Sequence, residues 1–255
     1  MNRLSGQIRE SIVLLASQGH SLRQISRELG LAKSTIYYHT RKIFGRKYVR
    51  MVFDYSPTRE LGEFLGLFAT DGCFYVDKKR YHYTFTVSLS KNQHRYAIIV
   101  QKMIQRIIGK RPRIDVKKRM VQLVVRGKAI YSFLKRFLEW RGRKSHSIHF
   151  KDSALRLGKV FLKGILRGLI AGDGSVYPPK HRVSFGVVSR RLARQFVSLL
   201  KDFGIHSNTY PVKYEGKKTL YHVHVTGRIN IQKFKIRVGL TDPTKERELN
   251  LALRR

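Results

Sequence analysis

The chain has 255 residues, of which 53 are Lys or Arg and only 16 are Asp or Glu, giving a formal net charge of +37 at neutral pH. So large a charge repels itself unless a polyanion is the partner, and nucleic acid fits better than a membrane surface because no amphipathic, lysine-rich anchor helix stands out. The single cysteine, Cys73, excludes a disulfide framework, and no signal peptide or membrane span is apparent, so we expect a cytoplasmic protein, nucleoid-associated in a prokaryotic host.

Residues 1–45 predict three short helices. Ser21 and Gln24 have the spacing of a capping box at the start of the second, and Gly30 makes the turn before a third helix at about 33–44. The stretch 21–43 resembles a helix-turn-helix DNA-binding domain, whose third helix would enter a major groove. A small helical bundle without DNA contact is the alternative. The outward residues of the third helix that suit base and phosphate contacts are Lys33, Ser34, Thr35, Tyr38 and Arg41.

Residues 46–56 are expected to form a partly docked linker, and two segments of similar pattern follow. Residues 57–145 predict the order αββαββα, with strands near 73–79, 81–89, 113–117 and 121–126 and helices near 93–108 and 129–140. Residues 146–255 predict the same order after a basic connector at 139–157, with strands near 175–177, 182–188, 208–213 and 219–226 and a helical tail after Pro243. The expected fold class is α+β, with two pseudo-symmetric repeats behind a small all-α domain.

Apolar and polar residues alternate along these strands, which predicts one buried and one polar face for each sheet. Two such sheets would form a curved saddle whose strands read a major groove. Merely solvated faces are the alternative, and the large positive charge argues against it. His222 and His224 share one face, but no third metal ligand is apparent nearby, so DNA contact is preferred for them. The candidate DNA contacts on the two sheets are His82, Thr84, Thr86, Arg113, Lys117, Arg119, Gln122, Arg126, Arg182, Ser184, His222 and His224.

One pattern occurs twice, at 62–72 and 164–174, with aligned residues 102 positions apart. Read as helices, both copies place small residues at i, i+4 and i+8 on one face. These are Gly62, Gly66 and Thr70 in the first copy and Gly164, Gly168 and Gly172 in the second. Glycine inside a helix costs about 0.5–1 kcal/mol relative to alanine, so such a stripe needs a reason. The usual reason is close helix packing, and we expect the two copies to pack against each other.

Each copy ends in Asp-Gly, where the glycine is well placed as a left-handed cap. Packed helices would bring Asp71 and Asp173 together, although the helix dipoles and mutual repulsion both disfavour two negative charges there. Bound divalent cations would relieve both effects, and hard oxygen ligands suit Mg²⁺ or Mn²⁺. A simple turn explains a single Asp-Gly, but it explains two matched copies poorly.

Residues 64–72 (FLGLFATDG) and 166–174 (LRGLIAGDG) resemble the two signature motifs of the LAGLIDADG homing endonucleases. The resemblance covers roughly residues 57–255 and implies a single-chain enzyme with two repeats. It implies that Asp71 and Asp173 bind catalytic Mg²⁺, with Mn²⁺ as a substitute, and that the carbonyls of Thr70 and Gly172 are further ligands. A polar or basic residue that helps catalysis is also implied after the second strand of each repeat. Those positions hold Ser90 and Lys91 in the first repeat and Ser189 and Arg190 in the second.

The leading hypothesis is therefore a monomeric, metal-dependent endonuclease that cuts both strands of double-stranded DNA at a long asymmetric site. Two alternatives stay open. One is a transcriptional regulator that kept the saddle and lost cleavage, although both motif acids are present. The other is an intron maturase that binds structured RNA, and a dual role with cleavage is compatible with the sequence.

Overall fold

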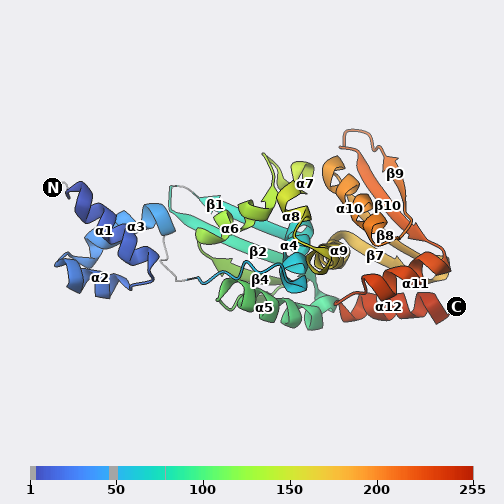
Figure 1. Cartoon of the computed structure of the whole chain (residues 1–255), viewed down its shortest axis with the longest axis horizontal. Coiled ribbons are helices and arrows are strands. Elements are labelled where there is room, and N and C mark those ends of the chain that lie inside the picture. Colours follow the sequence, from blue (N-terminus) through green and yellow to red (C-terminus); the bar gives the residue numbers. More distant parts are fainter. Residues whose placement is uncertain (1–3, 46–50, 78, 255) are drawn as a thin grey trace.

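The computed structural model describes residues 4–45, 51–77 and 79–254. Part of the predicted linker, residues 46–50, and residue 78 of the first predicted strand lie outside the described residues. Three N-terminal helices lie at one end of the long axis, and the first and second repeats follow along it (Figure 1). In the described residues, no helix combines the length and apolar character needed to cross a membrane.

The N-terminal helices are α1 (Gly6–Ser17), α2 (Leu22–Leu29) and α3 (Lys33–Phe44). They pack around a small core in which Ile12, Ile25 and Ile36 are fully buried. The predicted capping box is present, because the Ser21 side chain accepts from the backbone of Gln24 while the Gln24 side chain accepts from the backbone of Ser21.

The first repeat has the predicted order αββαββα. Its elements are α4 (Arg59–Asp71), β1 (Gly72–Asp77), β2 (His82–Ser90), a 3-10 turn η1 (Lys91–Gln93), α5 (His94–Ile108), β3 (Arg113–Val116), β4 (Met120–Arg126) and α6 (Ala129–Phe137). The four strands form one antiparallel sheet in the order β1-β2-β4-β3. Helix α6 ends before the predicted residue 140, because the chain there enters a short strand, β5 (Leu138–Glu139).

The predicted basic connector contains more regular structure than its sequence indicates. Strand β5 is followed by α7 (Lys144–Ser147), β6 (His149–Phe150) and α8 (Asp152–Leu155). Strands β5 and β6 pair antiparallel, with Leu138 opposite Phe150 and Glu139 opposite His149. This small sheet joins the end of the first repeat to the start of the second.

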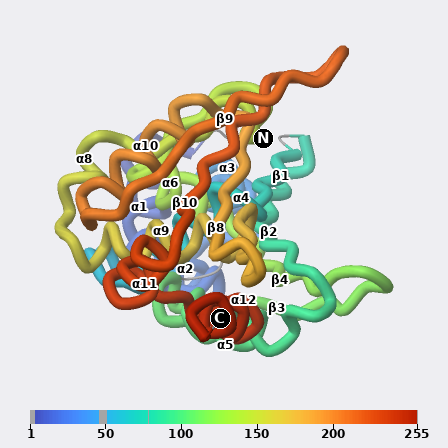
Figure 2. The backbone as a smooth tube through the Cα atoms, turned by 90° about the vertical axis from the view of Figure 1, so that its right-hand side faces the viewer, coloured from blue at the N-terminus to red at the C-terminus, as the bar shows by residue number. Residues whose placement is uncertain are grey.

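The second repeat has the same order of elements. They are α9 (Lys159–Asp173), β7 (Gly174–Tyr177), η2 (Pro178–Lys180), β8 (Arg182–Val187), α10 (Arg190–Asp202), β9 (Asn208–Val212), β10 (Leu220–Thr226), α11 (Arg228–Arg237) and α12 (Pro243–Arg254). Its sheet has the order β7-β8-β10-β9, equivalent to the order in the first repeat. Viewed along the long axis, β1–β4 lie to one side, β8 and β10 lie nearer the centre, and helices such as α8, α10 and α11 lie to the other side (Figure 2).

Helices α4 and α9 lie side by side at the centre of the molecule (Figure 1). The glycine stripe is the contact, as predicted. A Cβ atom on Gly66 would lie 2.5 Å from the Ile165 carbonyl oxygen, and one on Gly168 would lie 2.1 Å from that of Glu63. Any side chain on these positions would therefore push the two backbones apart. This close approach aligns the two helices and sets where their ends meet.

Candidate functional site: an acid pair between two basic sheets

Asp71 and Asp173 are the last residues of α4 and α9, so the packing of these helices brings the two carboxylates together. A Cβ atom on Gly172 would lie 1.9 Å from the Thr70 hydroxyl and 3.0 Å from an Asp71 carboxylate oxygen. The glycine therefore leaves room for the bulkier Thr70 opposite it. The two acids meet at the boundary between the two repeats, where β1 and β7 begin.

Ionisation of both acids in the pair is energetically unfavourable. The pKa of Asp71 is raised to about 6, chiefly because burial disfavours the ionised carboxylate and also because the charge of Asp173 is close. Burial also raises the pKa of Asp173, although part of this residue faces solvent. Lys144 and Lys245 act in the opposite direction on both acids, because their positive charges favour the ionised forms.

Each of these two lysines caps the end of one central helix. The Lys144 ammonium, from α7, donates to the carbonyl oxygens of Phe68 (2.7 Å), Ala69 (2.9 Å) and Thr70 (3.0 Å). The Lys245 ammonium, from the first turn of α12, donates to those of Ile170 (2.8 Å), Ala171 (2.6 Å), Gly172 (3.3 Å) and Gly174 (2.8 Å). The last carbonyls of a helix have no partner within it, and a cation there also complements the dipole. Burial lowers the pKa of Lys144 to about 8 and also lowers that of Lys245.

The sequence prediction did not single out these lysines. Lys144 was one of several basic residues in the connector, and Lys245 lay in the tail. A usable signal was present, because Lys144 follows Asp71 by 73 residues and Lys245 follows Asp173 by 72. The repeat therefore extends to the lysines, beyond the glycine stripe and the acids.

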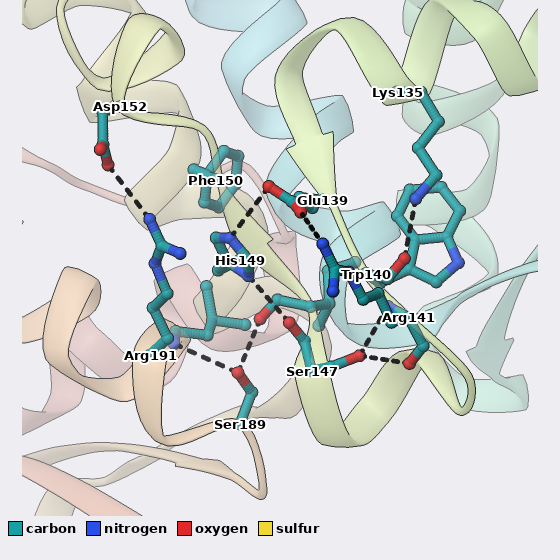
Figure 3. Close-up of polar contacts among 12 residues, drawn as sticks. Lys135, Glu139, Trp140, Arg141, Ser147, His149, Phe150, Asp152, Ser189 and Arg191 are labelled. Carbon is teal, nitrogen blue, oxygen red and sulfur yellow. Dashed lines mark hydrogen bonds and ion pairs between the residues drawn. The ribbon is translucent and has the colours of Figure 1, made fainter.

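The segment that carries Lys144 is held by contacts with both repeats (Figure 3). The Ser147 hydroxyl donates to the Arg141 carbonyl (2.6 Å) and accepts from the Arg141 backbone N–H (3.0 Å), which closes the loop around α7. His149, which is buried, lies between the Ser147 carbonyl (2.9 Å) and the Glu139 carboxylate (3.6 Å). From the second repeat, the Ser189 hydroxyl donates to the Ile148 carbonyl (2.7 Å). These contacts fix the position from which Lys144 reaches the acid pair.

Lys91 and Arg190, the proposed catalytic residues of the sequence prediction, begin η1 and α10. Both are exposed, and they follow β2 and β8 as expected. Ser189 stabilises the start of α10, because its hydroxyl accepts from the Leu192 N–H (3.3 Å). The ammonium groups that contact the helix ends at the acid pair come instead from Lys144 and Lys245.

The glycines that follow the two acids differ from the prediction. Gly72 and Gly174 have φ of −78° and −97°, so they are extended and begin strands rather than forming left-handed caps. The prediction of left-handed glycines was wrong because each chain passes directly from helix to strand. Glycine is required here for space, since a Cβ on Gly72 would lie 2.2 Å from the Phe68 ring.

The candidate DNA contacts of the strands lie on the face of each sheet opposite the core. In β2 the buried residues are Phe85, Val87 and Leu89, which places His82, Thr84 and Thr86 on the other face. In β4, Gln122 and Arg126 likewise alternate with buried residues, and the Gln122 amide donates to the Ser88 hydroxyl (3.0 Å). On the same face Arg113 forms an ion pair with Asp115 (2.7 Å), and Lys117 and Arg119 lie in the β3–β4 turn.

The second sheet presents a more aromatic face. Arg182 and Ser184 alternate with the buried residues of β8, and His222 and His224 alternate with those of β10. The rings of His222 and His224 lie 5.9 Å apart, and the Tyr210 ring lies 5.1 Å from that of His224. The two half-surfaces therefore differ in chemistry. On α3, Lys33, Ser34 and Tyr38 are exposed, Thr35 is half-buried, and Arg41 lies against Tyr81.

The acid pair offers oxygen donors of the kind that bind magnesium, but too few of them to surround an ion completely. Two carboxylates and the Thr70 and Gly172 carbonyls are hard oxygen donors, and Mg²⁺ typically combines one or two carboxylates with waters and phosphate oxygens. Across the described residues, no group of three or more His, Cys, Asp or Glu side chains is placed to hold a metal ion. The Thr70 and Gly172 carbonyls also accept from Lys144 and Lys245. The residues therefore offer an open set of hard oxygen donors, two of which, the carbonyls, already accept from the lysines.

Known protein families match both repeats. Residues 62–144 match the model described as the WhiA LAGLIDADG-like domain, and residues 161–239 match the one described as a LAGLIDADG-like domain. The chain is thus an α+β protein with two LAGLIDADG-like domains, preceded by the helices α1–α3.

Solved structures support this fold. One of the homing endonuclease I-DmoI has a TM-score of 0.54 at 16% identity, covering 72% of this chain and 97% of that one. I-DmoI in complex with DNA and Ca has a TM-score of 0.55 at 13% identity, covering 76% of this chain and 98% of that one.

A curated relative, the replication factor C small subunit of Thermococcus kodakarensis, is 29% identical over 192 residues, which is 75% of this chain and 21% of that protein. The match thus spans about a fifth of the relative's length.

Proposed function

We propose that this chain is a sequence-specific binding protein for double-stranded DNA. The observation that carries this proposal is the outer face of the two sheets, where polar and basic side chains alternate with the core residues of both repeats. Strands of this kind place hydrogen-bonding groups against base edges, and the surrounding cations contact phosphates. The I-DmoI structures with DNA and with Mn or Ca support the reading, as does the WhiA-type model match of the first repeat.

The expected target is long and asymmetric, because one chain supplies two half-surfaces of different composition. A monomer would be sufficient to occupy it. Selection of bound sequences from a random DNA pool tests this, followed by measurement of affinity for the selected site over a range of salt. Discrete selected sequences with a steep salt dependence support the proposal. Equal affinity for every duplex, or a preference for structured RNA as expected of a maturase, would refute it.

DNA cleavage is a second candidate function, and the adjacent Asp71 and Asp173 favour it specifically. Two neighbouring carboxylates are costly to ionise and would repel a polyanion. DNA binding alone therefore does not explain why both are present. With the Thr70 and Gly172 carbonyls, they would hold Mg²⁺ or Mn²⁺, which when bound stabilises charge on a phosphate and lowers the pKa of water. Lys144 and Lys245 keep positive charge beside the place where a scissile phosphate would lie, and their capping bonds hold both helix ends in position.

The test of cleavage uses the DNA selected above with Mg²⁺ or Mn²⁺. Double-strand cuts that disappear in Asp71→Asn and in Asp173→Asn, with binding retained, would support the nuclease. A matched control is Asp202→Asn, which removes a carboxylate at the end of α10. Specific binding without cuts in either metal would leave the regulator, which is the alternative that kept the saddle and lost cleavage.

A further inference from the structure

The end of α3 contacts the first repeat through a small set of side chains. The Lys128 ammonium donates to the Lys42 carbonyl oxygen (2.7 Å) and so caps the C-terminal end of α3. The Arg41 guanidinium lies 5.3 Å from the centre of the Tyr81 ring. Gly45, which ends α3 with a φ of +87°, packs so closely that a Cβ there would lie 3.1 Å from the Tyr83 ring. We call these contacts the junction.

Tyr81 has an unusual backbone at this junction. Its φ of 53° is in the left-handed region, which is unfavourable for a residue with a side chain and persists only where the surroundings enforce it. One other non-glycine residue among those described has a positive φ, and this is His181 (φ 41°). It occupies the equivalent turn of the second repeat, between β7 and β8. The His181 imidazole donates to the Ala252 carbonyl of α12 (2.5 Å). In both repeats, therefore, this turn holds an adjoining helix in place.

The linker is short, and its far end is bound to the first repeat. Residues beyond the linker's start are bound to the first repeat, because the Asp54 N–H donates to the Ile107 carbonyl (2.8 Å) and the Phe53 ring stacks on Phe133 at 4.7 Å. Met51 also packs against Gly127. Between Gly45 and Met51 the chain spans at most about 20 Å, less than one helical turn of DNA, about 34 Å.

Exposed cations lie on both sides of the junction. Helix α3 carries Lys33 and Lys42, and the first repeat carries Lys79 and Arg80 in the β1–β2 turn and Arg126 at the end of β4. Each of these side chains is exposed, and only Arg80 among them has a neighbouring acid, Asp77 at 4.0 Å, in the described residues. Cations on both parts are what contact with the phosphates of one continuous duplex requires.

We propose that the junction holds the three N-terminal helices as a fixed extension of the first repeat, so that α3 contacts double-stranded DNA directly beyond the outer end of the first half-site. The target would then be longer on the side of the first repeat than on the side of the second. The spacing between the α3 contact and the half-site would be set by Tyr81, Lys128 and the short linker. The proposal rests on the DNA-binding function above and adds the position and spacing of the α3 contact.

The experiment is footprinting of the full chain on its selected DNA, with and without five base pairs inserted between the first half-site and the outer protected segment. Lys33→Glu places an acid in the first turn of α3, where the helix dipole favours it, so the fold should be kept. Lys201→Glu, an exposed residue on α10, is the control for the change of charge. We expect Lys33→Glu and the insertion each to remove the outer protection and to weaken binding about tenfold. Lys201→Glu and an insertion on the second-repeat flank should leave both unchanged.

A second variant tests the junction itself. Tyr81→Gly with Lys128→Ala removes the ring and the cap, while the helices and the sheet keep their cores. We expect its circular dichroism and its protection of the two half-sites to match those of the wild type, and the outer protection to be lost. Outer protection that survives the five-base-pair insertion, or that persists in the Tyr81→Gly, Lys128→Ala variant, would overturn the proposal. Absence of any discrete footprint would instead refute the DNA-binding function on which it rests.

Discussion

The ammonium groups of Lys144 and Lys245 occupy equivalent places, each bonded to the last carbonyls of the central helix in its own repeat. One comes from the connector and the other from the C-terminal helix. Together they place two positive charges beside the two negative charges of Asp71 and Asp173. In a chain whose net charge is +37, these four charges balance one another.

Replacing Lys144 by Met tests this arrangement. Three carbonyls at the end of α4 would lose their donor, so the free energy of unfolding should fall by about 1–3 kcal/mol. Loss of a neighbouring cation should also raise the pKa of Asp71 above its value of about 6. Urea unfolding and carboxyl-carbon NMR measure the two effects. Lys91→Met, at an exposed position, should change neither, and an unaltered Asp71 pKa in Lys144→Met would contradict the charge pairing.

The raised pKa of Asp71 predicts a pH-dependent stability. The folded form keeps its proton up to about pH 6, whereas the unfolded carboxyl loses its proton near pH 4, so stability falls as the pH rises from about 4 to 6. Asp71→Asn removes this loss and should be more stable than the wild type by about 1–2 kcal/mol at pH 7.5, after allowance for solvent screening. The advantage should vanish at pH 4. Thermal and urea unfolding at both pH values measure it, and a destabilised Asp71→Asn at pH 7.5 would show the prediction to be wrong.

The glycine stripe predicts a large effect from a single methyl group. Gly168→Ala places a Cβ about 2.1 Å from the Glu63 carbonyl oxygen, so α4 and α9 must separate. We expect a loss of about 3 kcal/mol or more in the free energy of unfolding, at the upper end of overpacking costs. Gly6→Ala is the control, because Gly6 is also helical and has no atom within 4 Å of the added Cβ. Equal unfolding midpoints for the two variants would rule out the close contact.

The basic strand faces predict a measurable change in salt dependence. Lys117→Ala, in the β3–β4 turn, should lower the slope of log affinity against log salt by about 1, since one phosphate contact is lost. Lys201→Ala, at an exposed position of α10, should leave the slope unchanged. Fluorescence anisotropy with labelled duplex DNA between 50 and 300 mM salt, roughly the range over which such slopes are read, gives both values. Equal slopes for the two variants would place the phosphate contacts elsewhere.

Much of this fold could be predicted from local pattern. The repeat was visible because both copies keep the same glycine stripe and the same Asp-Gly ending. A stripe of small residues along a helix has few explanations other than close packing against a second helix. The two faces of the strands followed from alternation, since one register buries Phe85 and Val87 and exposes Thr84 and Thr86. These features depend on residues that are near one another in the chain, so periodicity alone reveals them.

Other features depended on contacts between distant segments, and only the tertiary structure decided them. Lys144 and Lys245 reach the acid pair because the connector passes beside the end of α4 and the terminal helix begins beside the end of α9. The extended backbone of Gly72 follows from the direct passage of α4 into β1 and from the Phe68 ring beside it. The sequence by itself determined the repeat, its two acids and the polarity of the sheets. The partners of those acids required the folded chain, because an ammonium at the end of a long flexible side chain is placed by its surroundings and not by its neighbours in sequence.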